Sequence, residues 1–395
     1  MAVVEDVLAA IGSIDTNRMA EPGEFTKRAF HNGKLDLTQV EALKDLIFAK
    51  TTAQRRLAVR QANGELGRVY VRWRECIVNL LADVEAVIDF AEEDQLDSGL
   101  LQRVLNETDQ LIAEMRSQLL SGKSGELLRN GVRVAIVGRP NVGKSTLLNL
   151  LCDRPAAIVT AIPGTTRDTL DVAVALAGYP VTFTDTAGIR EALDPIEQEG
   201  VTRARTAIST SDALVVMVDA SVTFMDTQGT LCNQDLCVDR LQREVVNVLS
   251  LNQSEPEVAH PRVIVLVNKI DLLPAKIERA NKLRLDAWHC DAPVHWVSCQ
   301  QRLSVDTFLT ALGQEVATLC SACLSGDVTF SNIRHRLLIE RALAHLHRFR
   351  SDQDRDLVIG AQHLRAATKQ IGKIAGIVSV EEVLSKIFSD FCIGK

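Results

Sequence analysis

The segment Gly-Arg-Pro-Asn-Val-Gly-Lys-Ser at 138–145 has the residue types and spacing of a phosphate-binding loop. An apolar run at 132–137 comes directly before it, and a helical pattern follows at 146–151. Glycines at both ends of the loop allow backbone N–H groups to surround phosphate oxygens at a helix N-terminus. Lys144 can reach the β- and γ-phosphates, and the Ser145 hydroxyl can bind Mg²⁺. The segment predicts a nucleoside triphosphate site.

Two further motifs supply the metal shell of that nucleotide. Asp-Thr-Ala-Gly at 185–188 ends the strand-like stretch 179–184, so we expect the Asp185 carboxylate to join the Mg²⁺ shell. Gly-Thr-Thr-Arg-Asp at 164–168 lies in a loop before a strand. There Thr166 can meet Mg²⁺ only when a γ-phosphate is present.

A third motif selects the base. Asn-Lys-Ile-Asp at 268–271 ends the buried-strand pattern 263–267. The Asp271 carboxylate can accept N1–H and N2–H of guanine, and adenine presents no matching donors, so we expect GTP. The stem of Lys269 can cover the ring, and Ser298 can touch the guanine oxygen. The predicted GTP contacts are Asn141, Val142, Gly143, Lys144, Ser145, Thr146, Thr160, Ala161, Ile162, Pro163, Gly164, Thr165, Thr166, Asp185, Thr186, Ala187, Gly188, Asn268, Lys269, Asp271 and Ser298.

Length and composition bound the rest of the chain. At 395 residues it is too long for one GTPase domain, and its 46% hydrophobic content is sufficient for packed cores. No run of about 18 uncharged apolar residues is present, which excludes a membrane span. The first residues, 1–14, lack the features of a secretory signal or a transit peptide. Nine scattered cysteines fit a reducing compartment, and we interpret Cys320 and Cys323 as ordinary thiols rather than metal ligands.

The net charge of −7 shows that the whole chain is not a polycation built for nucleic acid, so any RNA contact requires a local patch. The best candidate in the sequence is 333–350, an amphipathic helical pattern with one acidic residue, Glu340. Its basic residues are Arg334, His335, Arg336, Arg341, His345, His347, Arg348 and Arg350. A solvated helix face explains this pattern at least as well as a phosphate-binding one.

Helical patterns lie on both sides of the nucleotide motifs. Before them come helical stretches at 37–51, 65–89 and 101–120, and the last helix of the chain begins with a capping box formed by Ser379 and Glu382. Each part has apolar faces that need a partner. We therefore predict an α/β P-loop GTPase domain with a mostly parallel, Ras-like sheet at 131–319, inserted into an all-α helical bundle formed by 36–130 and 320–395.

The polar stretch 221–261 within the predicted GTPase domain has the composition of a loop insertion. We expect it to contain one short helix, at 237–249, and to be tolerated rather than functional.

These features together carry a resemblance to a known family. A GTPase core split into a helical domain, Glu-Pro-Gly-Glu-Phe-Thr-Lys-Arg-Ala-Phe at 21–30, Asn-Gly-Lys-Leu-Asp-Leu at 32–37 and Phe-Cys-Ile-Gly-Lys at 391–395 resemble the MnmE (TrmE) tRNA-modification GTPases over essentially the whole chain. The polar insertion and the segment 195–200 are similar to the mitochondrial, animal-type branch, which implies a mitochondrial location.

The resemblance implies a function and partners. Family members act with an FAD-dependent partner, MnmG, on carbon 5 of the wobble uridine of tRNA, and they use a folate-borne one-carbon unit. It implies a homodimer through the GTPase domains and a tetrahydrofolate derivative near Lys34 and Lys395. Cys392 is a candidate for the modification chemistry, although a packing role explains a cysteine there equally well.

Family proteins begin with a β-rich domain that binds folate and dimerises. Residues 1–35 resemble only its last, α+β segment, so we expect an N-terminally shortened form with weakened folate binding.

The hydrolytic step needs a group that orients water. Ile189 follows the Asp-Thr-Ala-Gly motif and can neither donate nor accept a hydrogen bond. The resemblance points instead to Glu197 as the catalytic residue, which otherwise reads as one acid of a Glu-rich helix. No arginine finger is obvious, and a bound K⁺ could supply the charge. The resemblance assigns K⁺ to the Asn141 side chain and to the carbonyls of Thr160, Ile162 and Thr165, whereas Asn141 could also be a turn former.

Two other functions remain open at this point. A ribosome-assembly GTPase would carry an RNA-binding module or a second GTPase domain, and the sequence after residue 320 shows neither a basic Gly-x-x-Gly turn nor a repeated phosphate loop. A regulatory form would bind nucleotide without modifying tRNA. GTP turnover with and without K⁺ separates the latter from an enzyme.

Overall fold

The computed structural model describes residues 2–15, 17–89, 99–154, 157–158, 171–185, 205–225, 234–250, 261–273, 282–285, 290–323, 329–352, 356–377, 387 and 391. Two compact units divide the chain. The helical unit comprises Met1–Ala49, Gln54–Glu126 and Ala322–Lys395, and the sheet unit comprises Lys50–Ala53 and Leu127–Ser321. The sheet unit is therefore inserted between two parts of the helical unit, as the sequence predicted. The boundary at which the chain passes from the helical unit into the main segment of the sheet unit falls inside α6 (Gly99–Asn130), between Glu126 and Leu127.

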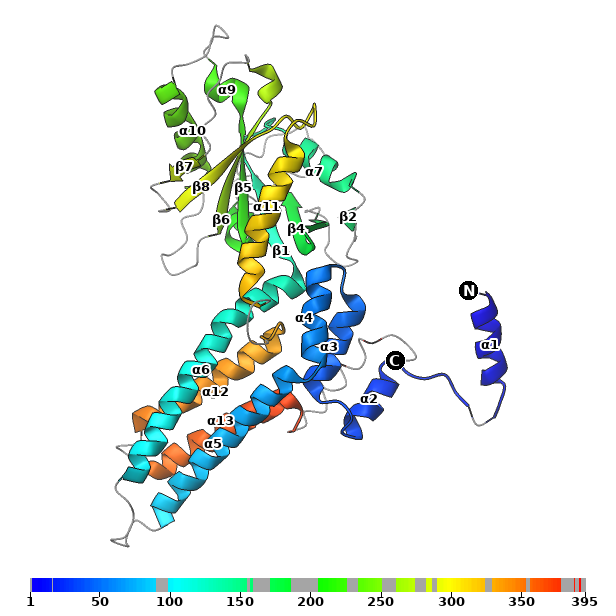
Figure 1. The fold of residues 1–395 in the computed structure, drawn as a ribbon, viewed down its shortest axis with the longest axis vertical. Helices are drawn as coiled ribbons and strands as arrows, with labels where there is room; N and C mark the ends of the chain where they lie inside the picture. Colours follow the sequence, from blue (N-terminus) through cyan, green and yellow to red (C-terminus); the bar gives the residue numbers. More distant parts are fainter. Residues whose placement is uncertain are drawn as a thin grey trace. The chain divides into compact units, whose positions relative to one another are not determined.

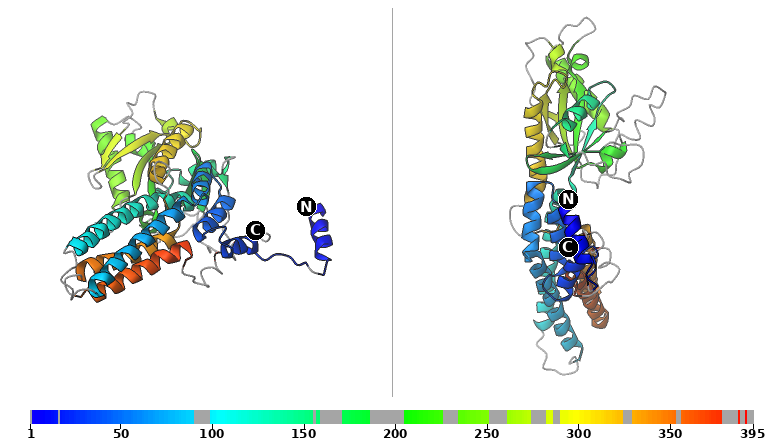
Figure 2. Two further views of the ribbon diagram at one scale, coloured as in Figure 1. Left: turned by 60° about the horizontal axis from the view of Figure 1, so that its bottom comes forward. Right: turned by 90° about the vertical axis from the view of Figure 1, so that its right-hand side faces the viewer.

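Four long helices form the main body of the helical unit, and they run side by side in Figures 1 and 2. These are α5 (Glu65–Asp89), α6 (Gly99–Asn130), α12 (Ile333–Asp352) and α13 (Leu357–Ala375). Their apolar residues recur every three or four positions, so each helix buries one stripe. The shared core includes Trp73 of α5, Met115 of α6, Leu346 of α12 and Leu364 of α13.

Shorter helices precede this bundle. They are α1 (Ala2–Gly12), α2 (Glu24–His31), α3 (Leu37–Phe48) and α4 (Thr52–Ala62). The start of α3 is set by Asp36, whose side chain accepts from the backbone N–H of Gln39, while the Gln39 side chain accepts from the Asp36 N–H in return. The single helix expected at 37–51 ends at Phe48, and α4 begins at Thr52. The helix expected at 101–120 is longer and extends over Gly99–Asn130.

An eight-stranded sheet forms the sheet unit, in the order β2-β3-β4-β1-β5-β6-β8-β7. The strands are β1 (Val132–Val137), β2 (Ala157–Ile158), β3 (Asp171–Leu176), β4 (Tyr179–Asp185), β5 (Ala213–Asp219), β6 (Arg262–Asn268), β7 (Lys282–Leu285) and β8 (Cys290–Trp296). The five strands from β4 to β8 in that order are parallel to their neighbours, and β2–β3, β3–β4 and β7–β8 pair antiparallel. The fold is thus the predicted α/β class with a mostly parallel sheet.

Both faces of this sheet are covered, which explains why its central strands are continuous apolar runs. On one face Ala135 and Val137 pack in a core with α10 (Gln234–Leu249) and α9 (Ala220–Phe224). The alternate residues of β1 point to the other face. Two helices, α7 (Lys144–Cys152) and α11 (Val305–Cys320), contact β3 and β4.

The helix expected at 237–249 within the polar stretch 221–261 is present and begins three residues earlier, while the described part of this stretch is more helical than a loop insertion with one short helix. Residues 220–224 form α9, and α10 spans sixteen residues, Gln234–Leu249. Leu241, Val245 and Leu249 of α10 are buried against β5 and β6 in the sheet core. The polar residues on the outer face of α10 made the stretch look like an exposed loop. Average composition does not distinguish an exposed loop from an amphipathic helix with one buried face.

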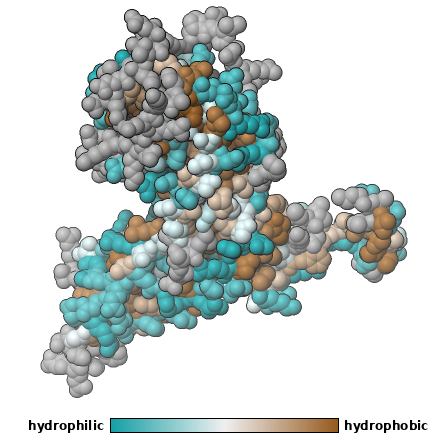
Figure 3. Space-filling model, turned by 45° about the horizontal axis from the view of Figure 1, so that its top comes forward, coloured by the Kyte–Doolittle hydropathy of each residue, from teal (hydrophilic) through white to brown (hydrophobic). Residues whose placement is uncertain are grey.

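Exposed apolar side chains on the described surface include a group on α1. Val3, Val7, Leu8 and Ile11 are all exposed, and α1 shows a brown, hydrophobic surface in Figure 3. Among the described residues, no helix is both long enough and apolar enough to cross a bilayer.

Candidate nucleotide-binding site

The carboxyl ends of the parallel strands bring the predicted nucleotide motifs to one edge of the sheet. Ile136 of β1 pairs with Asp185 of β4, and Asp219 of β5 pairs with Asn268 of β6. Ligands of open α/β sheets bind at this edge, where the loops after the strands converge. The register therefore explains how motifs more than a hundred residues apart in sequence can serve one ligand.

The phosphate-binding loop joins β1 to α7 in a tight turn. Gly143 has φ 105°, a conformation that residues with a Cβ rarely adopt, and a Cβ there would lie 2.3 Å from Asn268 Nδ2. A Cβ at Gly138 would lie 2.3 Å from the Met217 carbonyl oxygen. Asn141, at the exposed tip, has φ 61°, which fits its interpretation as a turn former. Both glycines are therefore required by close packing against the ends of β5 and β6.

Lys144 begins α7 and lies inside the curve of this loop. Its side chain is buried, and Nζ donates to the carbonyl oxygens of Gly138 at 2.9 Å and Arg139 at 2.8 Å. Ser145 and Thr146 are exposed in the first turn of α7. The first turn of a helix has backbone N–H groups that the helix itself does not use, and its dipole favours an anion. The loop thus combines a fixed ammonium with backbone donors, as phosphate binding requires.

Asn268 connects the phosphate-binding loop to the predicted guanine loops. Its Nδ2 donates to the Val142 carbonyl at 2.8 Å, and its Oδ1 accepts from the Cys299 backbone N–H at 3.0 Å. The side chain is 3% exposed. Asn268 was predicted as a direct GTP contact, whereas both ends of its amide bind protein groups here. In this structure it ties three loops together.

Lys269 has an ion-pair partner that the sequence reading missed. Its Nζ lies 2.6 Å from Oδ2 of Asp219, and Asp219 Oδ1 accepts from the backbone N–H and the hydroxyl of Ser221. Burial opposes ionisation of Asp219, but the hydrogen bonds from Lys269 and Ser221 outweigh it and lower the pKa of Asp219. The sequence signal that could have indicated this partner is the position of Asp219, an acidic residue at the end of the apolar run 213–218. The ion pair holds the Lys269 stem in place.

Asp271 lies in a short 3-10 helix, η1 (Ile270–Leu272), and one of its oxygens has no partner. Oδ1 is buried and accepts no hydrogen bond from any described residue. Burial and the nearby Asp271 charge raise the pKa of the Cys299 thiol to about 12. Ser298 is fully buried, and its Oγ accepts from the Gln301 N–H at 3.1 Å. A carboxylate oxygen withdrawn from water and left without a donor is suited to accept hydrogen bonds from a ligand.

Other predicted residues are only partly described or lie outside the description. Asp185 ends β4, and its backbone alone is described. The predicted residues outside the described part of the chain are Thr160, Ala161, Ile162, Pro163, Gly164, Thr165, Thr166, Thr186, Ala187, Gly188, Glu197, Cys392 and Lys395.

Lys34 belongs to the helical unit, in the exposed turn between α2 and α3. Phe391, four residues before the last residue of the sequence, is buried beside the start of α3, in one cluster with Leu37 and Val40. Leu35 packs against the same cluster. The chain next to Lys34 and the chain next to Cys392 therefore meet at the first turn of α3.

The predicted basic face of 333–350 is largely used inside the protein. Arg334 pairs with Glu41, Arg336 with Glu126 and Arg350 with Asp109, at 2.9, 2.9 and 2.8 Å. His335 is buried. The sequence left a solvated face and a phosphate-binding face both open for this helix, and these three arginines instead pair with carboxylates from α3 and α6.

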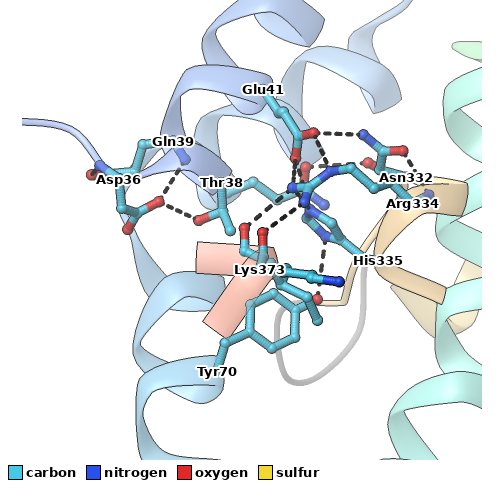
Figure 4. Close-up of polar contacts among 12 residues, drawn as sticks. Asp36, Thr38, Gln39, Glu41, Tyr70, Asn332, Arg334, His335 and Lys373 are labelled. Carbon is cyan, nitrogen blue, oxygen red and sulfur yellow. Dashed lines mark hydrogen bonds and ion pairs between the residues drawn. The ribbon is translucent and has the colours of Figure 1, made fainter. Parts of the chain in front are cut away.

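Figure 4 shows the centre of that arrangement, a buried cluster around Glu41. Arg334 donates through Nε to Glu41 Oε1 at 2.9 Å and through Nη2 to Oε2 at 3.0 Å. His335 Nε2 lies 2.7 Å from Oε2, and Asn332 Nδ2 donates to Oε1 at 3.1 Å. Arg334 also donates to the carbonyls of Lys373 and Ile374 at the end of α13. The cluster thus joins α3, α12 and α13.

The charges of this cluster compensate one another. Burial alone would raise the pKa of Glu41, but the charges and hydrogen bonds of His335 and Arg334 lower it to about 2. Burial raises the pKa of Tyr70, whose hydroxyl lies 3.3 Å from His335 Nδ1. When His335 is charged, as its effect on Glu41 requires, both ring nitrogens are donors, so Nε2–H donates to Glu41 and Nδ1–H donates to the Tyr70 hydroxyl oxygen. Apart from the basic residues of 333–350, no pattern in the sequence indicates this cluster.

The described cysteines show no metal site. Cys320 and Cys323 are buried and are not joined in a disulfide, and burial raises the pKa of Cys323 to about 11. Within the described residues, no three histidine, cysteine or acidic side chains gather as they would around a metal ion.

Comparison with known proteins extends these observations to the whole chain. The family model described as MnmE helical domain matches residues 37–392. The chain is 42% identical over 394 residues to the mitochondrial 5-taurinomethyluridine-tRNA synthase subunit GTPB3 of Danio rerio, an alignment covering 100% of this chain and 76% of that protein. The Homo sapiens protein of the same name is 40% identical over 395 residues, with coverage of 100% and 76%.

Bacterial relatives match over nearly the same span. The tRNA modification GTPase MnmE of Rickettsia typhi is 38% identical over 385 residues, which covers 97% of this chain and 78% of that protein. These identities run through both units and include the segments that carry the nucleotide motifs. The chain therefore belongs to the MnmE family of GTPases.

Proposed function

We propose that this chain hydrolyses GTP as one component of the modification of carbon 5 of the wobble uridine in tRNA. Its partners in this proposal are an FAD-dependent protein of the MnmG type, a tetrahydrofolate derivative and the tRNA. Family membership supports it, together with the names of relatives that are a tRNA modification GTPase and a taurinomethyluridine-tRNA synthase subunit. The mitochondrial names of the animal relatives support a mitochondrial location.

The observation that carries the nucleotide assignment is the unpartnered Oδ1 of Asp271. Leaving a buried charged acceptor without a donor costs roughly 1–3 kcal/mol or more, so such a group is retained where a ligand satisfies it. Guanine offers two N–H donors on one edge, which a carboxylate can accept together. The Lys269 stem, held by Asp219, is then available to cover the face of the base.

The phosphates are assigned to the loop at 138–145. Backbone N–H groups of the loop and of the first turn of α7 would hold the phosphate oxygens, with the Lys144 ammonium between the β- and γ-phosphates. The Ser145 hydroxyl and the Asp185 and Thr166 side chains fit a magnesium shell, since all three offer the hard oxygen ligands that Mg²⁺ prefers. A bound Mg²⁺ would neutralise charge that develops on the phosphates.

The hydrolytic group is assigned to Glu197, because Ile189 at the position after the Asp-Thr-Ala-Gly motif has no polar side chain. A carboxylate can orient a water molecule for attack on the γ-phosphate. Asn141 is exposed at the tip of the loop, and we propose that its side chain joins the carbonyls of Thr160, Ile162 and Thr165 around K⁺. K⁺ there would supply positive charge to the transition state.

The modification step is assigned to the helical unit. Lys34 and Lys395 would bind the folate, because ammonium groups suit its acidic tail, and Cys392 would act as the thiol nucleophile. The burial of Phe391 against Leu37 supports this proposal, since it brings the residue before Cys392 to the first turn of α3, close in sequence to Lys34. We further propose that the chain forms homodimers through its GTPase domains when GTP and K⁺ are bound.

The test of the GTPase assignment is steady-state GTP hydrolysis in K⁺ and in Na⁺ at equal ionic strength. We expect faster turnover in K⁺, and a loss of about 10² in turnover for Glu197→Ala with nearly unchanged GTP affinity. Equal rates in the two salts would remove the K⁺ assignment, and unchanged turnover of the variant would remove Glu197.

The test of the modification assignment is wobble-uridine analysis by mass spectrometry in cells whose own family member has been deleted. We expect the chain to restore the modification and Cys392→Ser to abolish it without slowing GTP hydrolysis. Retained modification in Cys392→Ser would return Cys392 to a packing role. Absence of modification with intact GTP hydrolysis would reject the modification function while the GTPase function stands.

A further inference from the structure

The helix α4 lies in a stretch of the chain that is rich in basic residues and, unlike α12, has no acidic residue of its own. Between Asp45 and Glu65 the chain has no acidic residue, yet this interval contains Lys50, Arg55, Arg56 and Arg60. In the whole chain acidic residues outnumber lysine and arginine by 51 to 44. Positive charge is therefore concentrated locally in a protein that is acidic overall.

The burial pattern of α4 turns part of this charge outward. Leu57, Ala58 and Gln61 are buried, whereas Arg55 and Arg56 are exposed. The Gln61 side chain donates to the Thr329 carbonyl at 2.7 Å, which fixes the rotation of the helix about its axis. Arg55 and Arg56 consequently point to solvent because of how the opposite face packs.

Within the described part of the chain, neither of these two side chains has a carboxylate partner. Arg55 and Arg56 form no hydrogen bond or ion pair with any residue that the structure describes. Arg56 and Arg60 stand four positions apart on one helix, so that both belong to the same side of α4. On α12 the same spacing places Arg336 opposite Glu340, at 3.6 Å.

A fourth arginine lies at the corner that follows α4. Gly64 turns the chain with φ 75°, and Arg68 in the first turns of α5 donates through Nη1 to the Asn63 carbonyl at 3.4 Å. Arg68 is exposed. We call Arg55, Arg56, Arg60 and Arg68 the α4 arginine surface. It lies on two consecutive helices of the helical unit.

We propose that the α4 arginine surface binds the sugar–phosphate backbone of tRNA. This inference rests on the proposed function, which requires the protein to hold a tRNA. Guanidinium groups form paired hydrogen bonds with phosphate oxygens, and a polyanion removes the repulsion between neighbouring arginines. Residues 52–62 contain no aromatic side chain on which a base could stack. The surface therefore supplies affinity and orientation and does not read the tRNA sequence.

The test is binding of a fluorescently labelled tRNA transcript to the full chain between 50 and 200 mM KCl, followed by anisotropy. We expect the double variant Arg55→Glu/Arg56→Glu to bind at least about 10-fold more weakly and to lower the slope of log affinity against log salt by about 1.5–2. GTP hydrolysis should not change, because neither arginine belongs to the nucleotide site.

The matched control is Arg341→Glu/Arg348→Glu on α12, which makes the same change in net charge at exposed arginines of the same unit. We expect this variant to lose less than about 3-fold in tRNA affinity. An equal loss in both variants would overturn the inference, since binding would then depend on net charge and not on α4. Unchanged tRNA affinity of the α4 variant, or no binding by the unaltered chain, would also overturn it.

An acidic protein is the other class of partner for such a surface. If the α4 variant binds tRNA normally but loses the FAD-dependent partner in a pull-down, the surface is a protein interface and the inference is wrong. Failure of the proposed function has a different signature, namely that the unaltered chain does not restore wobble-uridine modification in cells. The two failures are therefore read from separate measurements.

Discussion

Asp271 in the sheet unit and Glu41 in the helical unit both have carboxylate oxygens withdrawn from water, and their surroundings differ in one respect. Glu41 receives hydrogen bonds from Arg334, His335 and Asn332. Asp271 Oδ1 receives none from the described residues. The described residues thus supply hydrogen-bond donors to both oxygens of Glu41 but no donor to Oδ1 of Asp271.

The difference teaches how to separate a group that serves the fold from one that serves a ligand. A buried charge whose hydrogen-bonding capacity is filled from within stabilises one arrangement of helices and has little left to offer a ligand. A buried charge that lacks donors destabilises the empty protein and is stabilised when a ligand arrives. Mutations of the two acids should therefore move different observables.

The largest effect is expected for Asp271→Asn on GTP affinity. The variant removes the charge that accepts two guanine donors, and each such hydrogen bond contributes roughly 1.5–3 kcal/mol, so affinity should fall about 10³-fold. The asparagine amide can donate to a carbonyl oxygen at the same position of xanthine, so xanthosine triphosphate should bind better than GTP. Competition binding with the two nucleotides measures both changes.

The matched control for Asp271→Asn is Glu41→Gln, which should leave GTP affinity unchanged. Stability of the nucleotide-free protein should not fall in Asp271→Asn, because the variant removes the charge from a carboxylate whose Oδ1 is buried without a donor among the described residues. A large drop in its melting temperature without nucleotide would contradict the assignment of Asp271 as a ligand group.

The next effect in size is the loss of stability in Glu41→Gln. Neutralising Glu41 leaves the Arg334 guanidinium buried without its counter-charge, and breaking such a buried pair costs roughly 3–5 kcal/mol. Since the protein has two units, hydrogen exchange of α3 and α12 in urea is a better measure than a single unfolding curve. We expect both helices to lose protection together.

A surface pair provides the comparison for that measurement. Glu85 pairs with Arg365, and the two side chains are 40% and 52% exposed. Exposed pairs contribute about 0–1 kcal/mol, so Glu85→Gln should change the protection of α5 and α13 only slightly. Equal losses of hydrogen-exchange protection in Glu41→Gln and Glu85→Gln would show that the buried cluster stabilises the protein no more than an exposed ion pair does.

Sequence reasoning could predict a nucleotide site because the chemistry of such a site depends on short segments, and the contacts of individual residues with GTP stay predictions. Residues 138–145 define their own loop, since a glycine at 143 and a lysine at 144 have local geometric reasons to stand there. The strands at 132–137 and 263–267 were also evident from continuous apolar runs, and the structure gives them bounds within one residue of the prediction.

The Glu41 cluster escaped prediction because its members come from distant segments. Glu41 and Arg334 are 293 positions apart, and nothing local to either residue indicates the other. For the same reason the sequence could not show that arginines of 333–350 pair with acids of α3 and α6, which are distant in the chain. Asp219 was missed for a related reason, because its partner Lys269 follows a different strand.

A third prediction concerns Asn268, a buried polar group of the nucleotide site that is fully satisfied within the protein. Asn268→Ala leaves the Val142 carbonyl and the Cys299 N–H without their partners, which should cost about 2 kcal/mol of stability in the sheet unit. It should also lower GTP affinity about 10-fold, because the phosphate-binding loop loses its tie to the guanine loops. Thermal unfolding and nucleotide titration measure the two effects.

Asn268→Ala sharpens the comparison because it should move both observables, whereas Asp271→Asn and Glu41→Gln should each move one. Asn268→Asp is the companion variant, since it keeps the acceptor but replaces the donor to Val142 with a second acceptor. If Asn268→Ala lowered affinity with no change in stability, Asn268 would be a direct nucleotide contact as the sequence first suggested.

The smallest effect expected is the pH dependence contributed by Glu41. Its pKa is about 2 in the folded protein and 4.5 for the unperturbed group. A carboxyl with a lowered folded pKa stabilises the protein fully above its unfolded pKa, and this contribution is lost as the pH falls toward the folded pKa. Lowering the pH from 6 to 3.5 should therefore remove about 1 kcal/mol of stability through Glu41 alone.

Other carboxyls titrate in the same range, so the measurement is the difference in stability between the unaltered chain and Glu41→Gln, taken by hydrogen exchange of α3. The two should converge in stability as the pH falls, because the variant has no proton to bind at this position. A constant difference between pH 6 and 3.5 would contradict the lowered pKa and, with it, the view that the cluster holds Glu41 as a charged group.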